Sequence, residues 1–265
     1  MKLLKCMAIK LTSNEIAQRV LEKAVSSVQL LSGVGAGGGV RSSGEAALFH
    51  RLKAARGGNG FCIFDVGANR GQFLDLAISE LEPHPFTVHS FEPSAATFRM
   101  LAESRSPDPR VVLNPFGLGR TRGEATLWYD RPGSGLASLS KRRLDHFGTT
   151  FDHSERVTIE TLDDYCETRG IKHIDLLKVD VEGHELDVFA GGQRMMSGAI
   201  SMVSFEFGGC NIDTRTYFQD FFHFFRKFQM RLYRITPSGF LFPLPKYAEH
   251  FEQFRTTNFV AISDS

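Results

Sequence analysis

Apolar and polar residues recur with two different spacings along the chain from about residue 61 onward. Continuous apolar runs, which are typical of buried strands, occur at 61–66, 86–92, 110–114, 174–181 and 200–207. Segments with helical spacing lie between several of these runs, at 72–81, 94–104 and 184–192. This succession predicts a doubly wound, mostly parallel α/β sheet. Ligands bind at the carboxyl ends of the strands in such sheets.

The C-terminal part continues this pattern. The phenylalanines of 218–228 recur at helical spacing with polar residues between them, so we expect them to pack against the sheet. The segments MRLYRIT (230–236) and TNFVAI (257–262) predict the final pair of strands. We therefore assign residues 61–265 to one domain.

Two segments precede this domain. Residues 1–31 form a predicted helical extension, in which Ile16, Val20, Ala24 and Val28 share one helical face. We expect this face to pack on the main domain or on a second subunit, which makes a homodimer possible. Residues 32–60 begin with SGVGAGGGVRSSG, which lacks the flanking strand and the GK[ST] ending of a nucleotide loop, so we interpret it as a flexible linker.

Charge and cysteine content limit the partners and the location. The net charge is +1, from 31 basic and 30 acidic residues, so nothing in the overall charge would attract nucleic acid or an anionic membrane. Charged residues interrupt the N-terminal segment too often for a secretion signal, and we expect no transmembrane segment. The four cysteines are widely spaced and are interpreted as reduced thiols, which favours a cytoplasmic location.

The turn after the first predicted strand indicates a ligand. Asp65 ends that strand, and Gly67 and Gly71 give a G-x-x-x-G spacing that does not suit a dinucleotide. An aspartate at this position would repel a pyrophosphate and suits a cationic ligand. Glu92, at the end of the second strand, can accept hydrogen bonds from both hydroxyls of a ribose. A ribose joined to a cationic amino acid describes S-adenosylmethionine.

Two other function classes remain open from these residues. A nicotinamide-dependent oxidoreductase would use a similar sheet, but it would need the dinucleotide glycine pattern that this turn lacks. A non-catalytic binding protein could keep the fold, although such a protein could well have lost Asp65, Glu92 or Asp180, and all three are present.

Several segments together resemble the FkbM-type S-adenosylmethionine-dependent methyltransferases. They are FDVGANRGQF, SFEP, NPFGLG followed by GEATLW, TLDDY and, as the most specific, IDLLKVDVEGHELDVFAGG. The resemblance implies a class I methyltransferase (Rossmann-like) fold, with a seven-stranded sheet that has one antiparallel strand. It also implies methyl transfer to a hydroxyl oxygen.

The resemblance assigns cofactor-binding residues by position. Those expected to bind the methionine portion are Asp65, Gly67, Asn69 and Gly71, and Asp180 is expected beside the methyl group. Glu92, followed by Pro93, would bind the ribose, and Asn114 would lie on the adenine side. The segment FEFGGCNIDTRTYFQDFF looks like a subgroup found among glycan and sugar methyltransferases. A sugar or glycan hydroxyl is therefore the expected acceptor, with a polyketide or other small molecule as the alternative.

The segment KVDVEGHE contains candidate catalytic residues. Asp180 ends a predicted central strand, and His184 lies on the following turn, where it could take the proton that an alcohol must lose. His184 could equally precede the helix or face solvent without a catalytic role.

Glu206 ends the next strand and offers a second arrangement. With Asn211 and Asp213 it could bind a divalent metal, which we consider possible but do not favour. The charged run at 141–143, KRR, is interpreted as a solvated surface patch.

Overall fold

The computed structural model describes residues 9–56 and 60–264. The first eight residues of the predicted N-terminal extension, which include Cys6, therefore lie outside the described part. The elements up to the middle of the chain are α2 (Glu15–Leu31), α3 (Ala46–Arg56), β1 (Phe61–Val66), α4 (Gln72–Leu81), β2 (Phe86–Phe91), α5 (Ala95–Glu103), β3 (Val111–Asn114), β4 (Gly117–Leu118), β5 (Gly123–Tyr129) and the 3-10 helix η1 (Asp145–Phe147). The remaining elements are β6 (His153–Glu160), α6 (Leu162–Thr168), β7 (Ile174–Val179), α7 (Glu185–Ala190), α8 (Gln193–Met196), β8 (Ile200–Phe207), α9 (Cys210–Thr214), α10 (Phe218–Lys227), β9 (Met230–Ile235), β10 (Leu241–Pro243), the 3-10 helix η2 (Glu249–Phe251) and β11 (Thr257–Ser263).

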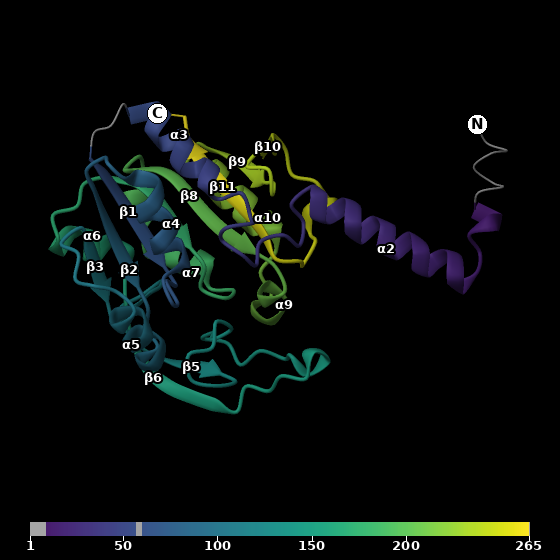
Figure 1. The fold of residues 1–265 in the computed structure, drawn as a ribbon, viewed down its shortest axis with the longest axis horizontal. Coiled ribbons are helices and arrows are strands. Elements are labelled where there is room, and N and C mark those ends of the chain that lie inside the picture. The colour runs from purple at the N-terminus through teal and green to yellow at the C-terminus, as the bar shows by residue number, and fades with distance from the viewer. Residues whose placement is uncertain (1–8, 57–59, 265) are drawn as a thin grey trace.

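The main sheet has the strand order β10-β9-β11-β8-β7-β1-β2-β3 (Figure 1). Strands β3, β2, β1, β7 and β8 pair in parallel, and β11 runs antiparallel between β8 and β9. This is the predicted class I arrangement, and the fold class is confirmed. The three-residue strand β10 adds an eighth strand at the edge through antiparallel pairing with β9. The strand order reverses between β1 and β7: β2 and β3 follow on one side of β1, whereas β7 and β8 lie on the other, and doubly wound folds bind ligands at this point.

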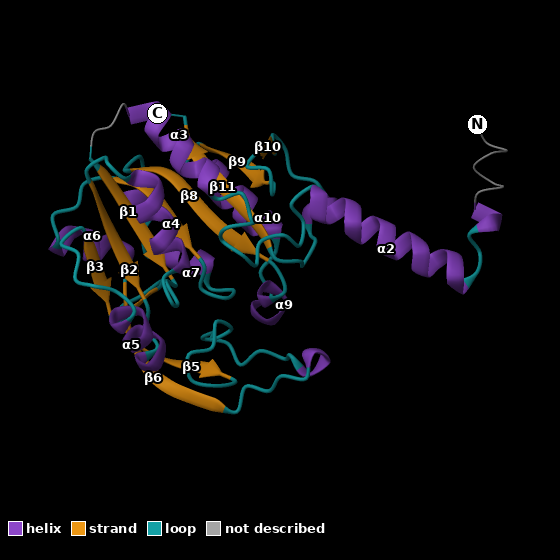
Figure 2. Ribbon diagram, in the orientation of Figure 1, coloured by secondary structure: helices purple, strands orange, loops and turns teal. Residues whose placement is uncertain are grey.

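Helices cover both faces of this sheet (Figure 2). Because successive strand residues point to opposite faces, Ile63 and Leu176 join one hydrophobic core while Phe64 and Leu177 join the other. The first core contains residues of α3, α4 and α5, and the second contains residues of α6, α7, α8 and α10. The phenylalanines of α10 pack in the second core as predicted; Phe221 stacks on Phe205 of β8 with ring centroids 4.9 Å apart.

A second, three-stranded sheet was not predicted from the sequence. Its order is β4-β6-β5, with β5 and β6 antiparallel. Figure 1 shows it beside the carboxyl ends of the main strands, together with the long connection between β5 and β6. This placement encloses the space above the point where the strand order reverses.

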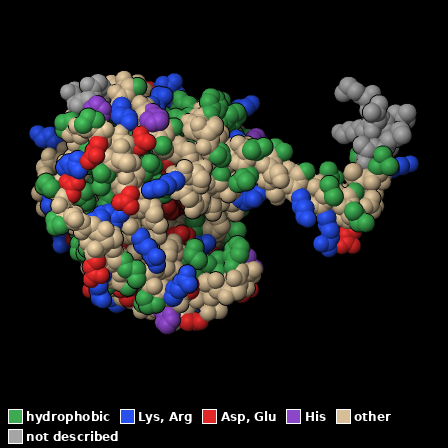
Figure 3. Space-filling model, viewed as in Figure 1, with side chains coloured by type: hydrophobic (Ala, Val, Ile, Leu, Met, Phe, Trp, Pro, Cys, Tyr) green, Lys and Arg blue, Asp and Glu red, His purple; other side chains and the backbone are tan. Residues whose placement is uncertain are grey.

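The N-terminal helix α2 extends away from the body of the protein (Figure 1). None of its residues is buried, and apolar side chains such as Ile16 and Val28 are exposed (Figure 3). The expectation that its apolar face packs on the main domain is therefore wrong. Its association with a second subunit stays a prediction. No helix in the described ranges has both the length and the apolar character needed to cross a membrane.

The glycine-rich segment after α2 does not have the character of a free linker. Val34, Ser43 and Glu45 are buried, and the Gly37 amide donates to the Thr256 carbonyl at 3.0 Å. Gly44 approaches β9 so closely that a Cβ on it would lie 2.0 Å from the Thr236 carbonyl oxygen. The linker interpretation is corrected, because the small residues serve close packing on the C-terminal strands.

Candidate active site

A cavity of about 770 Å³ lies at the carboxyl ends of β1, β7 and β8. The glycine-rich segment and the connection between β5 and β6 complete its walls. A smaller pocket adjoins it toward β2 and the second sheet. Figure 3 shows acidic side chains inside a hollow between the main body of the protein and the part that contains the second sheet. The two cavities share five lining residues, Gly67, Asn69, Gly135, Asp180 and Glu182.

The turn after β1 is fixed by backbone contacts. The amides of Gly67 and Ala68 both donate to the Phe91 carbonyl, at 3.0 and 2.9 Å. Gly67 has a φ of +84°, and a Cβ there would lie 1.9 Å from the Asp180 carbonyl oxygen. Asn69 also adopts a left-handed conformation, which asparagine tolerates better than most residues. Gly67 therefore allows the ends of β1 and β7 to meet.

Gly71 has a packing role that the sequence analysis did not predict. It lines neither cavity, and its carbonyl accepts a hydrogen bond from Arg105 at 2.9 Å. A Cβ on Gly71 would lie 2.3 Å from the Arg105 guanidinium. Gly71 is thus required for the packing of Arg105 against the start of α4. Its contact with the cofactor stays a prediction.

Glu92 lines the smaller pocket together with Pro93. One carboxylate oxygen accepts a hydrogen bond from the backbone amide of Asn69 at 3.0 Å, and the other accepts one from the backbone amide of Ser94 at 2.9 Å. Burial raises the Glu92 pKa to about 7, although these two amides act to lower it. Each oxygen keeps a further lone pair, so the carboxylate is fixed in place and can still bind ligand hydroxyls.

Asn114 lines neither cavity, and its place on the adenine side stays a prediction. Its side-chain amide donates to the Ser90 and Val112 carbonyls, and its oxygen accepts from Tyr165 at 3.2 Å. The Asn114 carbonyl accepts from the Glu92 amide at 3.1 Å. Asn114 therefore supports the strand end that holds Glu92. Apolar residues of the second sheet, which the prediction missed, line the smaller pocket: Leu118, Leu127 and Ile159.

The larger cavity contains a concentration of carboxyl groups. Asp65 is only 2% exposed, and one of its oxygens has no hydrogen-bond partner. Burial raises the Asp65 pKa to about 7; Lys178 opposes this shift, and Asp180 reinforces it. Burial, followed by the charges of Asp180 and Glu182, raises the pKa of Glu206 well above its usual range. A carboxyl group with a pKa of about 7, as for Asp65, can exchange protons near neutral pH.

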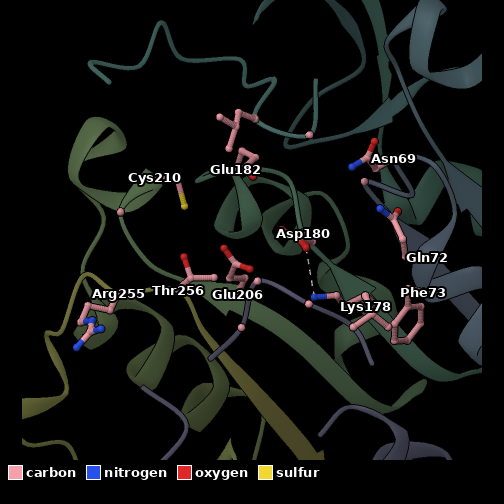
Figure 4. Close-up of a pocket in the computed structure, with 18 of the residues that line it drawn as sticks. Asn69, Gln72, Phe73, Lys178, Asp180, Glu182, Glu206, Cys210, Arg255 and Thr256 are labelled. Atoms are coloured by element: carbon pink, nitrogen blue, oxygen red, sulfur yellow. Dashed lines mark ion pairs between the residues drawn. The ribbon is translucent and has the colours of Figure 1, made fainter. Parts of the chain in front are cut away.

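Lys178 is the cation at the centre of this group, and the sequence prediction missed it. It lies on β7 between Asp65 of β1 and Ser204 of β8 in the strand register. Its ammonium lies 3.5 Å from an oxygen of Asp180 and 3.4 Å from one of Glu45. The dashed line in Figure 4 marks the ion pair with Asp180. Burial alone would lower the Lys178 pKa, but the surrounding carboxylates outweigh it and raise the pKa above its ordinary value. The side chain therefore stays charged.

His184 is held away from the larger cavity. Its Nε2 lies 3.0 Å from the Ser140 hydroxyl, and its Nδ1 lies 2.9 Å from an Asp187 carboxylate oxygen. It lines only the smaller pocket, just before α7 begins. Both ring nitrogens thus have partners within the protein, which favours a positioning role over the predicted proton transfer.

The residues proposed as metal ligands after β8 are engaged in other contacts. Asn211 is fully buried; its side chain accepts from the Gly208 amide and donates to Thr216, both at 2.8 Å. Asp213 pairs with Arg142, which also pairs with Glu182. Within residues 9–56 and 60–264, no group of three or more His, Cys, Asp or Glu side chains is arranged to hold a metal ion. The interpretation of the KRR run as a solvated patch is corrected for Arg142, because this side chain is paired with Glu182 and Asp213.

The chain belongs to the FkbM methyltransferase family, because the Methyltransferase FkbM domain matches residues 65–235. This confirms the predicted family, and it disfavours the oxidoreductase alternative. Hexuronic acid methyltransferase AglP of Haloferax volcanii is 29% identical over 146 residues, which cover 54% of this chain and 53% of that protein. 2-O-methyltransferase NoeI of Sinorhizobium fredii is 27% identical over 145 residues, which cover 51% and 58%.

The chain thus spans about half the length of the curated relatives that it matches. Among solved structures, an FkbM methyltransferase from Methylobacillus flagellatus aligns with a TM-score of 0.47 at 14% identity, over 80% of this chain and 47% of that one.

The buried carboxyl group of Asp65 predicts an unusual dependence of stability on pH. Between about pH 4 and 7 the folded protein retains a proton on Asp65 that the unfolded chain releases, so its contribution to stability falls as pH rises. The change that Asp65→Asn makes in the free energy of unfolding of the ligand-free protein should therefore be more stabilising at pH 8 than at pH 4, by on the order of 3 kcal/mol. Urea unfolding at both pH values measures this difference. Equal effects at both pH values, as expected for the exposed control Asp145→Asn, would contradict it.

Proposed function

We propose that the protein transfers a methyl group from S-adenosylmethionine to a hydroxyl oxygen of a sugar or glycan. Two joined cavities at the point where the strand order reverses support this proposal, since a cofactor and an acceptor must meet there. The names of two relatives, a hexuronic acid methyltransferase and a 2-O-methyltransferase, support a sugar acceptor.

The residues around the smaller pocket fit the nucleoside part of this cofactor. Glu92 is positioned to accept from ribose hydroxyls, and the apolar side chains of Leu118 and Ile159 suit a flat ring. The unpartnered oxygens of Asp65 and Asn69 fit the cationic amino group of the methionine part, because buried acceptors normally have a donor. The cofactor residues that we propose are thus Asp65, Gly67, Asn69, Glu92, Pro93 and Asp180.

Asp180 and Glu206 are the proposed catalytic residues. Bound S-adenosylmethionine supplies a methyl carbon on a positively charged sulfur, and methyl transfer breaks the carbon–sulfur bond as the carbon–oxygen bond forms. Asp180 borders both cavities and therefore lies where the acceptor hydroxyl must be aligned. Glu206 lines only the larger cavity, and there it takes the hydroxyl proton and passes it to solvent. A polyketide acceptor remains the alternative.

The ribose assignment predicts a loss of cofactor affinity in Glu92→Ala. Hydrogen bonds to a charged group are typically worth about 1.5 to 3 kcal/mol, so the Kd for S-adenosylmethionine should rise roughly tenfold or more. Calorimetric titration measures this change, with the exposed Glu103→Ala as the control. Unchanged affinity in a folded Glu92→Ala protein would remove Glu92 from the cofactor site.

The proton-transfer assignment predicts a separation of turnover from cofactor binding. A general base typically contributes about 10²- to 10⁴-fold, so Glu206→Gln should lower kcat within that range and leave the cofactor Kd nearly unchanged. Asp180→Asn should lower kcat comparably, and His184→Ala should lower it less. The wild-type rate should fall as pH drops through the raised pKa of Glu206, because a protonated carboxyl group cannot act as a base.

Two results would contradict this assignment. A larger loss in His184→Ala than in Glu206→Gln would return the proton transfer to the histidine. Complete loss of activity in the presence of a chelator, restored by a divalent cation, would instead support metal-assisted catalysis.

A further inference from the structure

The glycine-rich segment 33–45 forms part of the wall of the larger cavity. Gly35, Gly37, Gly38 and Gly39 line it, although all of them lie outside the residues 65–235 that match the family. The backbone is fixed to the C-terminal strand by the Gly37 bond to Thr256 and by a 3.3 Å bond from the Gly35 amide to the Thr257 hydroxyl. This wall therefore lies outside the part of the chain that matches the family's domain.

The segment also brings a buried carboxylate into the cavity. Glu45 is 1% exposed, and its Oε2 accepts from the Ser43 hydroxyl at 2.7 Å. Its Oε1 accepts no hydrogen bond, and Lys178 Nζ lies 3.4 Å from it. Charge-assisted N–H···O bonds are usually about 2.7 to 2.9 Å long, so this contact satisfies neither group fully. Buried polar groups generally have partners, and here a ligand can supply one.

The charges of the cavity limit which ligand fits beside Glu45. The carboxyl groups that line it are Glu45, Asp65, Asp180, Glu182 and Glu206. Of the arginines that line it, Arg142 is paired with Glu182 and Asp213, and Arg255 donates to the Gln29 side chain. Figure 4 shows the Arg255 side chain directed away from Lys178 and Asp180. A further negative charge would be repelled, whereas hydroxyl groups can both donate to Glu45 and accept from Lys178.

We propose that Glu45, Lys178 and the glycine wall form a subsite that binds an uncharged sugar of the acceptor through its hydroxyls, a proposal that rests on the proposed function above. The rim of the cavity supports a sugar in particular. Phe147 is 74% exposed and Leu136 is 40% exposed, and both line the cavity. Such exposed apolar groups suit the C–H face of a sugar ring, while the polar wall opposite binds its hydroxyls.

Gly38 allows this subsite to be blocked without a change in the packing of the protein. A Cβ on Gly38 would meet no atom within 4 Å. Gly38→Val should therefore place a branched side chain in the cavity and raise the acceptor KM about tenfold or more, with a cofactor Kd within about twofold of wild type. Gly60→Val is the matched control, since Gly60 is exposed and lines neither cavity.

Glu45→Gln tests the polar contact, with Glu103→Gln as its control. We expect its acceptor KM to rise by about tenfold, as for the loss of a hydrogen bond to a charged group.

The acceptor probes are the methyl glycosides of glucose, galactose, mannose and fucose, compared with those of glucuronic and galacturonic acid. Formation of S-adenosylhomocysteine reports turnover, and calorimetry reports cofactor binding. The neutral glycosides should show the higher kcat/KM, by about tenfold or more.

The outcomes separate this subsite from the function on which it rests. Failure of the wild type to bind S-adenosylmethionine would overturn the proposed function itself. Cofactor binding without turnover of any glycoside would overturn the sugar acceptor, and the subsite with it. Turnover that favours the uronic acids would overturn the uncharged class. An unchanged acceptor KM in both Gly38→Val and Glu45→Gln would overturn the placement of the subsite.

Discussion

The site depends on one buried cation and the carboxyl groups that compensate it. An ammonium within a sheet is costly to bury unless opposite charges surround it, and Lys178 meets this condition through Glu45, Asp180, Glu206 and Asp65. The compensation is mutual, because Lys178 also limits the rise in the pKa of Asp65. These groups come from three strands and the N-terminal segment. The requirement for charge balance therefore ties the segment outside the family's domain to the centre of the sheet.

The fold concentrates these charges where the strand order reverses. Helices diverge from the sheet at this point, so the strand ends are left open to a ligand. Gly67 lets the turn after β1 contact the end of β7, and Asn69 continues the turn so that its amide fixes Glu92. The second sheet and the connection between β5 and β6 close the space from the other side. One binding region thus has a carboxylate-rich half and an apolar half.

Much of this arrangement could be predicted from the sequence. Apolar runs identified the parallel strands, and polar residues at their ends identified Asp65, Glu92, Asp180 and Glu206. Glu45 could not be found because its segment has the composition of a linker, and only tertiary packing places it beside Lys178. Gly71 and Asn114 were assigned by position in a motif, and His184 by its place on the turn after a strand. Their contacts in the structure are with Arg105, Tyr165 and Ser140, respectively. Spacing alone does not show which way a side chain points.

We propose that this group of carboxyl groups receives the cationic part of the cofactor. Because the pKa of Asp65 is about 7 in the free protein, a ligand cation beside it should force the bound proton off. Calorimetric titration of S-adenosylmethionine at pH 6.5, in buffers with different ionisation enthalpies, measures this directly. We predict the release of roughly half a proton or more per cofactor bound. Binding with no net proton release, or with proton uptake, would contradict the account.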